Sequence, residues 1–477
     1  MKNYIKKWSL ILLTVFAFQA CETVDFGDTN VNPNSPSTAS TAALLTNAES
    51  FIPTIVSEVN SNLMVQYISE ITYTEDSRYE QFEWSYDAWY SGPLKDLQEI
   101  IDLNTSDPET YKNGGATENQ IAVARILKVY FYLYLTDRWG MIPYSEALQG
   151  SDNIKPKFDT QEAIYTSLFS EIDESLGSIN TSGALNGDLL FNGDMSHWKK
   201  FANTLKLVMA MRISNVNQSL GQQKLTEAYN AGVIGSVAEN IHYPYLTEDT
   251  NDNPWQDRFQ TREDYAVSDV FVNWLVDHND PRIASYAELP LSDATGTYIG
   301  CPYGVQNPNV LQSDISFITD DIIYDGTQAG GMIFSYAQVC FSMAEAALRG
   351  MTTVGDAETW YNLGIDASME QWGISTADAL SYKSQATVAY DAANGLEQIA
   401  IQKWASLYLQ GAEAWSEWRR LDFPKLEPAE DALSGNGIPV RNGYAALTKS
   451  LNEENYNAAV ASQGADTQDT RLWWDTK

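Results

Sequence analysis

Flat aromatic side chains beside polar ones are the residues of this sequence best suited to binding chemistry. They gather in three segments without sustained helical periodicity, at 73–93, 243–259 and 298–309. A Tyr or Trp ring can stack on the apolar C–H face of a sugar, while Asn, Asp and Arg bond to its hydroxyls. The candidate ligand-binding residues are Tyr73, Arg78, Tyr79, Trp84, Tyr86, Asn253, Trp255, Tyr298 and Tyr303. We expect at least one of the first two segments to line a binding site.

Residue patterns that carry catalysis are absent from the sequence. The three histidines, His197, His242 and His278, lie far apart, and none is followed three or four residues later by a metal ligand of the HExxH kind. The chain has no G-x-S-x-G elbow, no P-loop and no G-x-G-x-x-G. Among 63 acidic residues some pair will resemble a glycosidase dyad, but the sequence does not give the separation that identifies one. We therefore expect a protein that is not an enzyme.

One acidic segment begins like a calcium-binding loop. In "DTNDNPWQDRFQ", from Asp249, the sixth position is Pro254 instead of Gly and the twelfth is Gln260 instead of Glu. These two departures exclude an EF-hand. A structural calcium ion held in some other way by the Asp- and Asn-rich loops stays possible, and otherwise we expect no cofactor.

The elements that must position these loops are mainly helices. In Thr117–Trp139, apolar residues recur at spacings of three and four, the pattern of an amphipathic helix. Similar patterns predict helices at 92–103, 160–176, 196–216, 334–349, 357–372 and 396–420. Residues 240–330 and 421–477 are rich in Asp, Asn, Pro and Gly, and there we expect loops with a few short strands. The fold class is therefore mainly α, with a single body over 41–477.

Several helices are of similar length, as in proteins built of stacked helix pairs. "WYNLG", Trp360–Gly364, matches the opening of a tetratricopeptide repeat, although Ala367 stands where the repeat has Tyr. Tryptophans at helical spacing are core residues more often than ligand platforms. We therefore assign structural roles to Trp198, Asn203, Arg212, Trp404, Trp415, Trp418, Arg419 and Arg420. The two last arginines are expected to satisfy buried carboxylates or carbonyls.

The N-terminus has the pattern of an export signal that ends at a cysteine. Residues 1–20 combine three lysines with the apolar run "SLILLTVFAF", which is too short to span a bilayer. Cys21 follows Ala20 directly, so we predict that the Cys21 thiol is lipidated and becomes the first residue of the mature protein. Residues 21–40 are polar and predict a flexible tether. Membrane attachment would then be through the lipid alone.

Charge and cysteine content limit the possible partners. The formal net charge is −34, and it becomes −37 without residues 1–20, which hold three lysines and no acids. A surface this acidic argues against nucleic acid as a partner, because phosphate contacts require basic patches. Cys301 and Cys340 remain, too few for a disulfide framework. Cys340 lies in an apolar helical pattern that favours a buried free thiol, and a pair between the two stays open.

Six segments together resemble the SusD/RagB family, and most closely its SusD-like branch of nutrient-binding outer-membrane lipoproteins from Bacteroidetes. They spread over nearly the whole chain in the family's order. They are "DFGDTNVNPNSPS" after Cys21, "DLLFNGDMSHWKKFANTLKLVMAMRIS" at 188–214, "SYAQVCFSMAEAALRG" at 335–350, "WYNLGIDASMEQWG" at 360–373, "IAIQKWASLYLQGAEAWSEWRRLDFP" at 399–424 and "RLWWD" at 471–475. The loops at 70–90 and 240–330 depart from the family pattern.

The resemblance implies a fold, a location and a role. The fold is a scaffold of tetratricopeptide-like helix pairs carrying a loop-rich half. The location is the outer face of the outer membrane, held by the lipid on Cys21. The role is to capture an oligosaccharide or another small nutrient and deliver it to a TonB-dependent, SusC-like barrel. Since the departing loops would choose the ligand, its identity is left open between glycans and peptides.

Two other readings of the residues stay open. A tetratricopeptide-type scaffold could serve protein–protein assembly, and a secreted glycoside hydrolase could use a carboxylate pair that the sequence does not reveal. Retention of an unaltered oligosaccharide would separate the binding protein from both.

Overall fold

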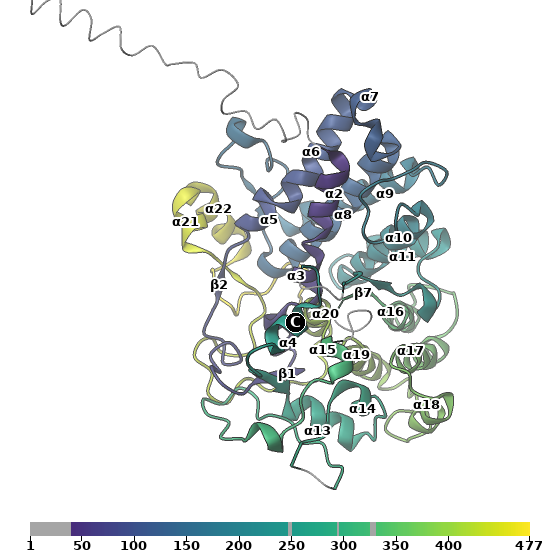
Figure 1. Ribbon diagram of the computed structural model, residues 1–477, viewed down its shortest axis with the longest axis vertical. Coiled ribbons are helices and arrows are strands. Elements are labelled where there is room, and N and C mark those ends of the chain that lie inside the picture. Colours follow the sequence, from purple (N-terminus) through teal and green to yellow (C-terminus); the bar gives the residue numbers. More distant parts are fainter. Residues whose placement is uncertain (1–39, 247–249, 293–294, 325–330) are drawn as a thin grey trace, which may run out of the picture. The chain divides into compact units, whose positions relative to one another are not determined.

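The computed structural model describes residues 40–246, 250–292, 295–324 and 331–477. Within them the chain is mainly helical, as its periodicity predicts, with a few short strands (Figure 1). The predicted signal, Cys21 and nearly all of the predicted tether lie outside the described residues. From Thr41 onward the chain forms one compact unit.

The first part of the scaffold contains helices that pack in sequence order. Their bounds are α2 Thr41–Glu49, α3 Ile52–Val56, α4 Val59–Met64, α5 Asp87–Ser91, α6 Pro93–Ser106, α7 Pro108–Tyr111, α8 Thr117–Trp139, α9 Gln161–Ser178, α10 Met195–Arg212 and α11 Gln218–Ala231. Helix α8 packs against α6 and α9, and α10 packs against α9 and α11. Residue types that favour N-caps stand where these helices begin. The Asp194 side chain accepts from the Ser196 amide at the start of α10, and the Asn217 side chain accepts from the Leu220 amide at the start of α11.

The second part continues this arrangement. Its helices are α16 Tyr336–Leu348, α17 Ala357–Gln371, α18 Thr376–Lys383, α19 Gly395–Ser406 and α20 Gly411–Leu421. Helix α16 packs against α17, α19 and α10, so the two parts join into one scaffold, seen in Figure 1 from α8 through α10 and α16 to α18. The predicted helix pairs are confirmed.

The predicted helix at 396–420 is wrong in one respect, because the structure divides it into α19 and α20. Leu409, in the break, has a φ of +60°. At Gly411 the backbone of α4 comes so close that a Cβ atom would lie 2.5 Å from the Asn62 amide nitrogen. The turn lets α20 begin in contact with α4. This contact joins segments that are distant in the sequence, so helical periodicity does not predict it.

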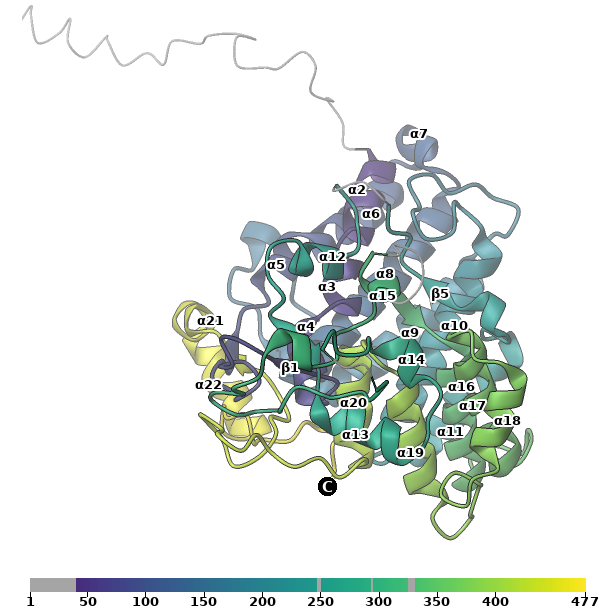
Figure 2. The same ribbon diagram turned by 60° about the horizontal axis from the view of Figure 1, so that its bottom comes forward.

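The loop-rich part holds short elements, which Figure 2 brings to the front at α12, α13, α14 and β1. Its helices are α12 Pro254–Phe259, α13 Asp269–Asp277, α14 Ile283–Tyr286, α15 Asp320–Tyr324, α21 Ala446–Leu451 and α22 Glu453–Gln463. Four two-stranded pairs connect distant segments: β1 Ile68–Glu70 with β6 Tyr265–Val267, β2 Glu83–Trp84 with β8 Gly443–Tyr444, β3 Ile142–Pro143 with β4 Phe158–Asp159, and β5 Ile241–His242 with β7 Met332–Phe334. All are antiparallel except β2–β8.

Two apolar cores hold the unit together. The larger core lies among the scaffold helices, and the smaller one lies where α4, α13, α19 and α20 meet the loop-rich part. Trp198, Trp404 and Trp415 are buried in these cores, which confirms their predicted structural role. The indole N–H of each of these three tryptophans also finds an acceptor, and that of Trp404 donates to the Val65 carbonyl at 3.1 Å.

A network of buried charges runs between the helices of the scaffold. Arg420 is fully buried and donates to both carboxylate oxygens of Glu345 and to Glu417. Lys403 donates to Glu417 as well, at 2.7 Å. Arg419 donates to the Asp137 carbonyl at 2.7 Å and lies over the Trp415 ring. The prediction that Arg419 and Arg420 satisfy buried acceptors is confirmed.

Candidate functional site

An open pocket of about 540 Å³ lies where the β1–β6 pair ends. Strands β1 and β6 pair antiparallel, so the loop that leaves β1 at 71–80 and the loop that enters β6 at 259–264 lie at the same end. The Ile71 amide donates to the Asp264 carbonyl at 2.9 Å and extends this contact into the loops. The volume is that of a small-molecule site. The pocket is lined by Thr72, Tyr73, Phe259, Gln260, Thr261, Arg262, Glu263, Asp264 and Gln312.

Tyr73 gives this pocket an exposed aromatic face. Its side chain is 64% exposed, although large aromatic residues normally bury most of their surface. Its backbone has a φ of +60°, a conformation that is uncommon and strained for a bulky residue. Strain of this kind persists only where surrounding contacts hold the chain, and it clusters at functional sites.

Arg262 lies against Tyr73. Its guanidinium carbon is 5.1 Å from the centre of the Tyr73 ring, the geometry of a cation–π contact. The same guanidinium donates to the Asp264 carboxylate, which fixes its orientation and balances its charge. The arrangement offers a flat platform with hydrogen-bonding groups around it, the chemistry that a sugar ring requires.

The loop that carries Tyr73 is anchored by residues that the sequence marked as ligand contacts. The Arg78 Nε donates to the Asp431 carbonyl at 2.9 Å, and the Tyr79 hydroxyl accepts from the Ala429 amide at 3.0 Å. Both side chains are buried. Their contacts connect the 71–80 loop, which carries Tyr73, to the segment that follows α20.

Glu70, at the end of β1, fixes the same loop from within. Its carboxylate accepts from the Ser77 amide at 2.8 Å and from the Ser77 hydroxyl at 2.9 Å. Burial raises the pKa of Glu70 from its ordinary value of 4.5 to about 7, although the Ser77 bonds act in the opposite direction. The folded protein therefore takes up a proton at Glu70 in a pH range where the unfolded chain is ionised.

We expect Glu70→Gln to remove part of the pH dependence of stability. Because the folded-state pKa is raised, wild-type stability falls as pH rises from 4.5 to about 7, by at most ~3 kcal/mol from this group. Gln keeps an acceptor for Ser77 and carries no charge. In urea denaturation at about pH 8, the free energy of unfolding of the variant should exceed that of the wild type. This difference should shrink towards about pH 5. Glu80→Gln, at an exposed carboxylate of the same loop, is the control, and an equal difference at both pH values would contradict the assignment.

The second wall of the pocket rests on α12. Asn253 caps this helix by accepting from the Trp255 amide at 3.1 Å, and its side-chain amide donates to the Ile322 carbonyl at 2.7 Å. Trp255 is fully buried, with the Arg258 guanidinium 4.8 Å from its ring centre. These two residues hold α12 in place, and Phe259 at its end enters the pocket lining.

The remaining candidates lie elsewhere. Tyr303 is buried and donates from its hydroxyl to the Leu63 carbonyl at 2.7 Å. Tyr298 is half-buried against the smaller core, and Trp84 lies half-buried in β2. Tyr86 is buried, with its ring edge-on to Trp139.

Of the nine candidates, Tyr73 alone lines the pocket at the end of β1 and β6. A side chain without exposed surface cannot stack on a ligand in this conformation, so the visible role of Arg78, Tyr79, Asn253, Trp255 and Tyr303 is support. Ligand contact by any of the nine stays a prediction.

Sequence reasoning missed the polar residues of the pocket, above all Arg262, Asp264, Gln260 and Gln312. The signal that could have found all of these except Gln312 is the run "QTRED", directly after a short aromatic helix and before a strand. Nothing in that run indicates Tyr73 as its partner, because strand pairing brings the two segments together.

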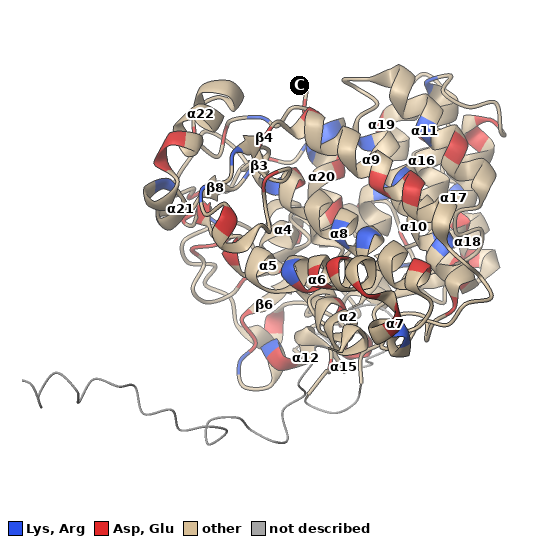
Figure 3. Cartoon of the chain, turned by 90° about the horizontal axis from the view of Figure 1, so that it is seen from above, with Lys and Arg blue, Asp and Glu red and all other residues tan. Residues whose placement is uncertain are grey.

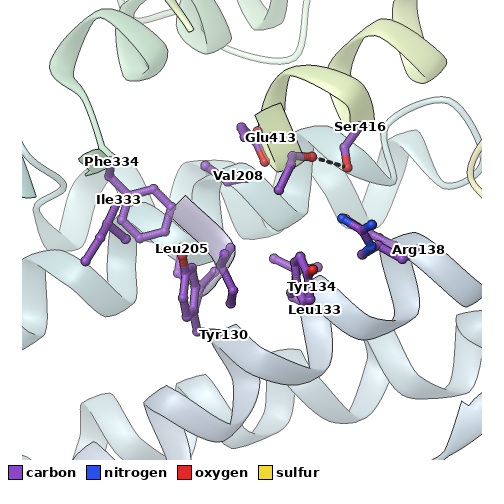
Figure 4. A pocket seen from close by; sticks show the side chains of 13 residues that line it. Tyr130, Leu133, Tyr134, Arg138, Leu205, Val208, Ile333, Phe334, Glu413 and Ser416 are labelled. Carbon is purple, nitrogen blue, oxygen red and sulfur yellow. Dashed lines mark hydrogen bonds between the residues drawn. The ribbon is translucent and has the colours of Figure 1, made fainter. Parts of the chain in front are cut away.

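Two other spaces are less suited to a sugar. A cavity of about 60 Å³ lies inside the scaffold among α8, α10 and α20 and is lined by Tyr130, Leu205 and Glu413 among others (Figure 4); it has room for a few water molecules. A groove of about 580 Å³ between α5, α21 and the loop at 147–158 is larger. Its exposed large side chains are aliphatic: Ile154, Leu447 and Leu451. The groove also has aromatic residues in its lining, of which Tyr86, one of the nine candidates, and Phe158 are buried and Tyr90 is half-buried.

Metal ligands and thiols form no further site among the residues that the structure describes. Within the described residues no three His, Cys, Asp or Glu side chains come close enough to hold a metal ion. The structural calcium ion that the sequence left open stays untested. Cys301 and Cys340 are both free and buried, so a pair between them is wrong and the buried thiol predicted for Cys340 is confirmed. Burial raises the pKa of both thiols to about 12. In the part of the chain that the structure describes, no helix is both long and apolar enough to cross a bilayer.

Residues 33–445 match a family of SusD-like proteins described as "Starch-binding associating with outer membrane". No curated protein matches the chain. Similar solved structures include a chitin-binding protein with 28% identity and a TM-score of 0.78, over 92% of this chain and 100% of that one. A SusD homologue from Bacteroides uniformis shares 25% identity, with a TM-score of 0.77 over 91% and 99% of the chains. A chitin-binding SusD homologue from Flavobacterium johnsoniae shares 24%, with a TM-score of 0.75 over 92% and 99%.

Proposed function

Because this chain belongs to the family of SusD-like proteins described as starch-binding and associating with the outer membrane, we propose that it captures an oligosaccharide in the Tyr73–Arg262 pocket without cleaving it. The observation that carries the proposal is the strained, exposed Tyr73 ring held against the Arg262–Asp264 ion pair. Thr72, Gln260 and Gln312 add neutral donors and acceptors beside that ring. Such groups match the hydroxyls and amides of a sugar.

Chitin oligosaccharides are the first ligands to test. The relative with 28% identity is a chitin-binding protein, and its structure covers nearly the whole of this chain. An N-acetylglucosamine unit presents an apolar ring face to Tyr73 and an acetamido group to the Gln side chains of the pocket. Maltose oligomers are the second choice, from the description of the family.

Calorimetric titration with N-acetylglucosamine and glucose hexamers tests the proposal. We expect saturable binding of at least one hexamer, and chromatography after long incubation should recover that hexamer intact. Release of shorter products would contradict binding without catalysis and favour the glycoside hydrolase. Absence of binding to any member of a wider oligosaccharide panel would contradict a glycan as the ligand.

Delivery to a TonB-dependent, SusC-like barrel is the second part of the proposal. It rests on the family, whose members associate with the outer membrane, and on the lack of catalytic motifs in the sequence. A tagged chain expressed in its own cells should purify with a barrel protein after mild detergent extraction. Purification of the intact lipoprotein without any barrel, at several detergent concentrations, would count against delivery.

Cys21→Ala should release the protein from the membrane. The apolar run before Cys21 is too short to span, so the proposed lipid on the thiol is the attachment. We expect radioactive palmitate to label the wild type and not the variant, and the variant to move from the membrane to the soluble fraction. Equal labelling of both proteins would refute the anchor, and Cys340→Ala is the matched control because that thiol is buried.

A further inference from the structure

The segments that form the pocket are unusually poor in basic residues. No lysine occurs between Lys7 and Lys95, or between Lys224 and Lys383, and the pocket lining comes entirely from these two stretches. Sites that bind carboxylated or sulfated ligands use Lys and Arg to balance the ligand charge. In this pocket, arginine side chains would therefore have to supply the positive charge that neutralises an anionic ligand.

Each arginine between Lys224 and Lys383 contacts another side chain of the protein. Arg262 is paired with Asp264, Arg282 with Asp280, and Arg349 with Glu345. Arg258 lies over the buried Trp255 ring and outside the pocket lining. In the first stretch, Arg78 is buried and donates to the Asp431 carbonyl. Among the described residues that line the pocket, Arg262 is the one cation, and the Asp264 carboxylate balances its charge.

The pocket and the loop that carries Tyr73 contain several carboxylates instead. Glu263 is exposed and lines the pocket, and the Tyr73 loop continues with Glu75, Asp76 and Glu80. Burial and the nearby Glu80 and Glu75 raise the pKa of Asp76, so these groups are close enough to repel one another. Figure 3 shows blue segments interspersed with red ones along the chain beside β6 and α12. The charged side chains of the lining are one cation, Arg262, and two carboxylates, Glu263 and Asp264, so negative charge is in excess there.

We propose that this pocket selects neutral and amino-bearing sugars and rejects carboxylated and sulfated ones. The inference rests on the proposed oligosaccharide function and concerns only the charge of the ligand. A protonated amine on a sugar ring gains from the field of Glu263, whereas a uronate loses by the same field. An uncharged unit relies on Tyr73 stacking and on the neutral hydrogen-bonding groups of the pocket.

Three hexamers of matched length test the selection: N-acetylglucosamine, glucosamine and galacturonic acid. We expect the glucosamine hexamer to bind at least as tightly as the neutral one at low salt, and to weaken as salt screens the carboxylates. The galacturonic acid hexamer should show no binding. Equal affinity of the neutral and anionic hexamers would overturn the selection while leaving the proposed function intact, whereas binding of none would count against both.

Glu263→Lys should reverse the preference. We expect the cationic hexamer to bind about fivefold more weakly and the anionic one to gain detectable affinity, from the field of one nearby charge in water. The neutral hexamer should keep its affinity within about twofold. Glu453→Lys makes the same change in net charge at an exposed site on α22 and is the matched control. A shift of equal size in both variants would assign the effect to net charge and overturn the local selection.

Discussion

Tyr73→Ala should weaken oligosaccharide binding about thirtyfold while leaving the protein folded. The variant removes the exposed ring that stacks on the sugar, a loss of ~2 kcal/mol in binding free energy. Stability should change by less than ~0.5 kcal/mol, because the ring is mostly in solvent. Titration calorimetry gives the affinity and urea denaturation gives the free energy of unfolding.

Tyr73→Gly sharpens this prediction. Glycine adopts the φ of +60° without the strain that a tyrosine suffers, so the variant should be as stable as the wild type or more so. A gain in stability together with a loss of binding would identify Tyr73 as a residue kept for function. Tyr324→Ala removes another half-exposed tyrosine, on α15 and outside the pocket lining, and should leave binding unchanged. If the Tyr73 variants kept full affinity, this pocket would not be the oligosaccharide-binding site.

Arg420→Met should destabilise the fold by ~3–5 kcal/mol. The variant leaves Glu345 and Glu417 without the guanidinium that both contact in the buried network. Arg420 lowers the pKa of both carboxylates, so its stabilisation is present above their ordinary pKa and is lost as pH falls. The deficit of the variant, measured by urea denaturation, should therefore be largest at neutral pH and smaller near pH ~4.

A second substitution distinguishes loss of charge balance from loss of packing. Glu345→Leu added to Arg420→Met removes one uncompensated carboxylate, and we expect it to restore part of the lost stability. A double variant less stable than Arg420→Met alone would mean that the arginine acts through packing. Lys425→Met, at an exposed lysine shortly after α20, should cost less than ~1 kcal/mol.

The helices of the scaffold could be predicted because the spacing of apolar residues within each segment indicates a helix. The spacing of apolar residues in Thr117–Trp139 gives α8 with the same bounds, and the other helices predicted before residue 396 agree to within a few residues. Helices α11 and α22 were not predicted. The break between α19 and α20 could not be predicted in this way. It arises from the approach of α4 at Gly411, a contact between segments far apart in the chain.

The pocket was only partly predictable, and for a related reason. Tyr73 stands in a polar segment and is exposed, as its composition suggests. Trp255 stands in a similar segment and is fully buried, because Asn253 caps a short helix that turns the ring into the smaller core. Composition near an aromatic residue therefore did not indicate its exposure. Arg262 was missed because β1–β6 pairing brings it to Tyr73.

A crystal structure of the protein with a bound oligosaccharide tests the central claim most directly. We predict density for a sugar ring on the exposed face of Tyr73, with polar contacts to Gln260, Arg262 or Gln312. A sugar bound in the groove between α5 and α21, with the Tyr73 pocket empty at saturating ligand, would contradict the account.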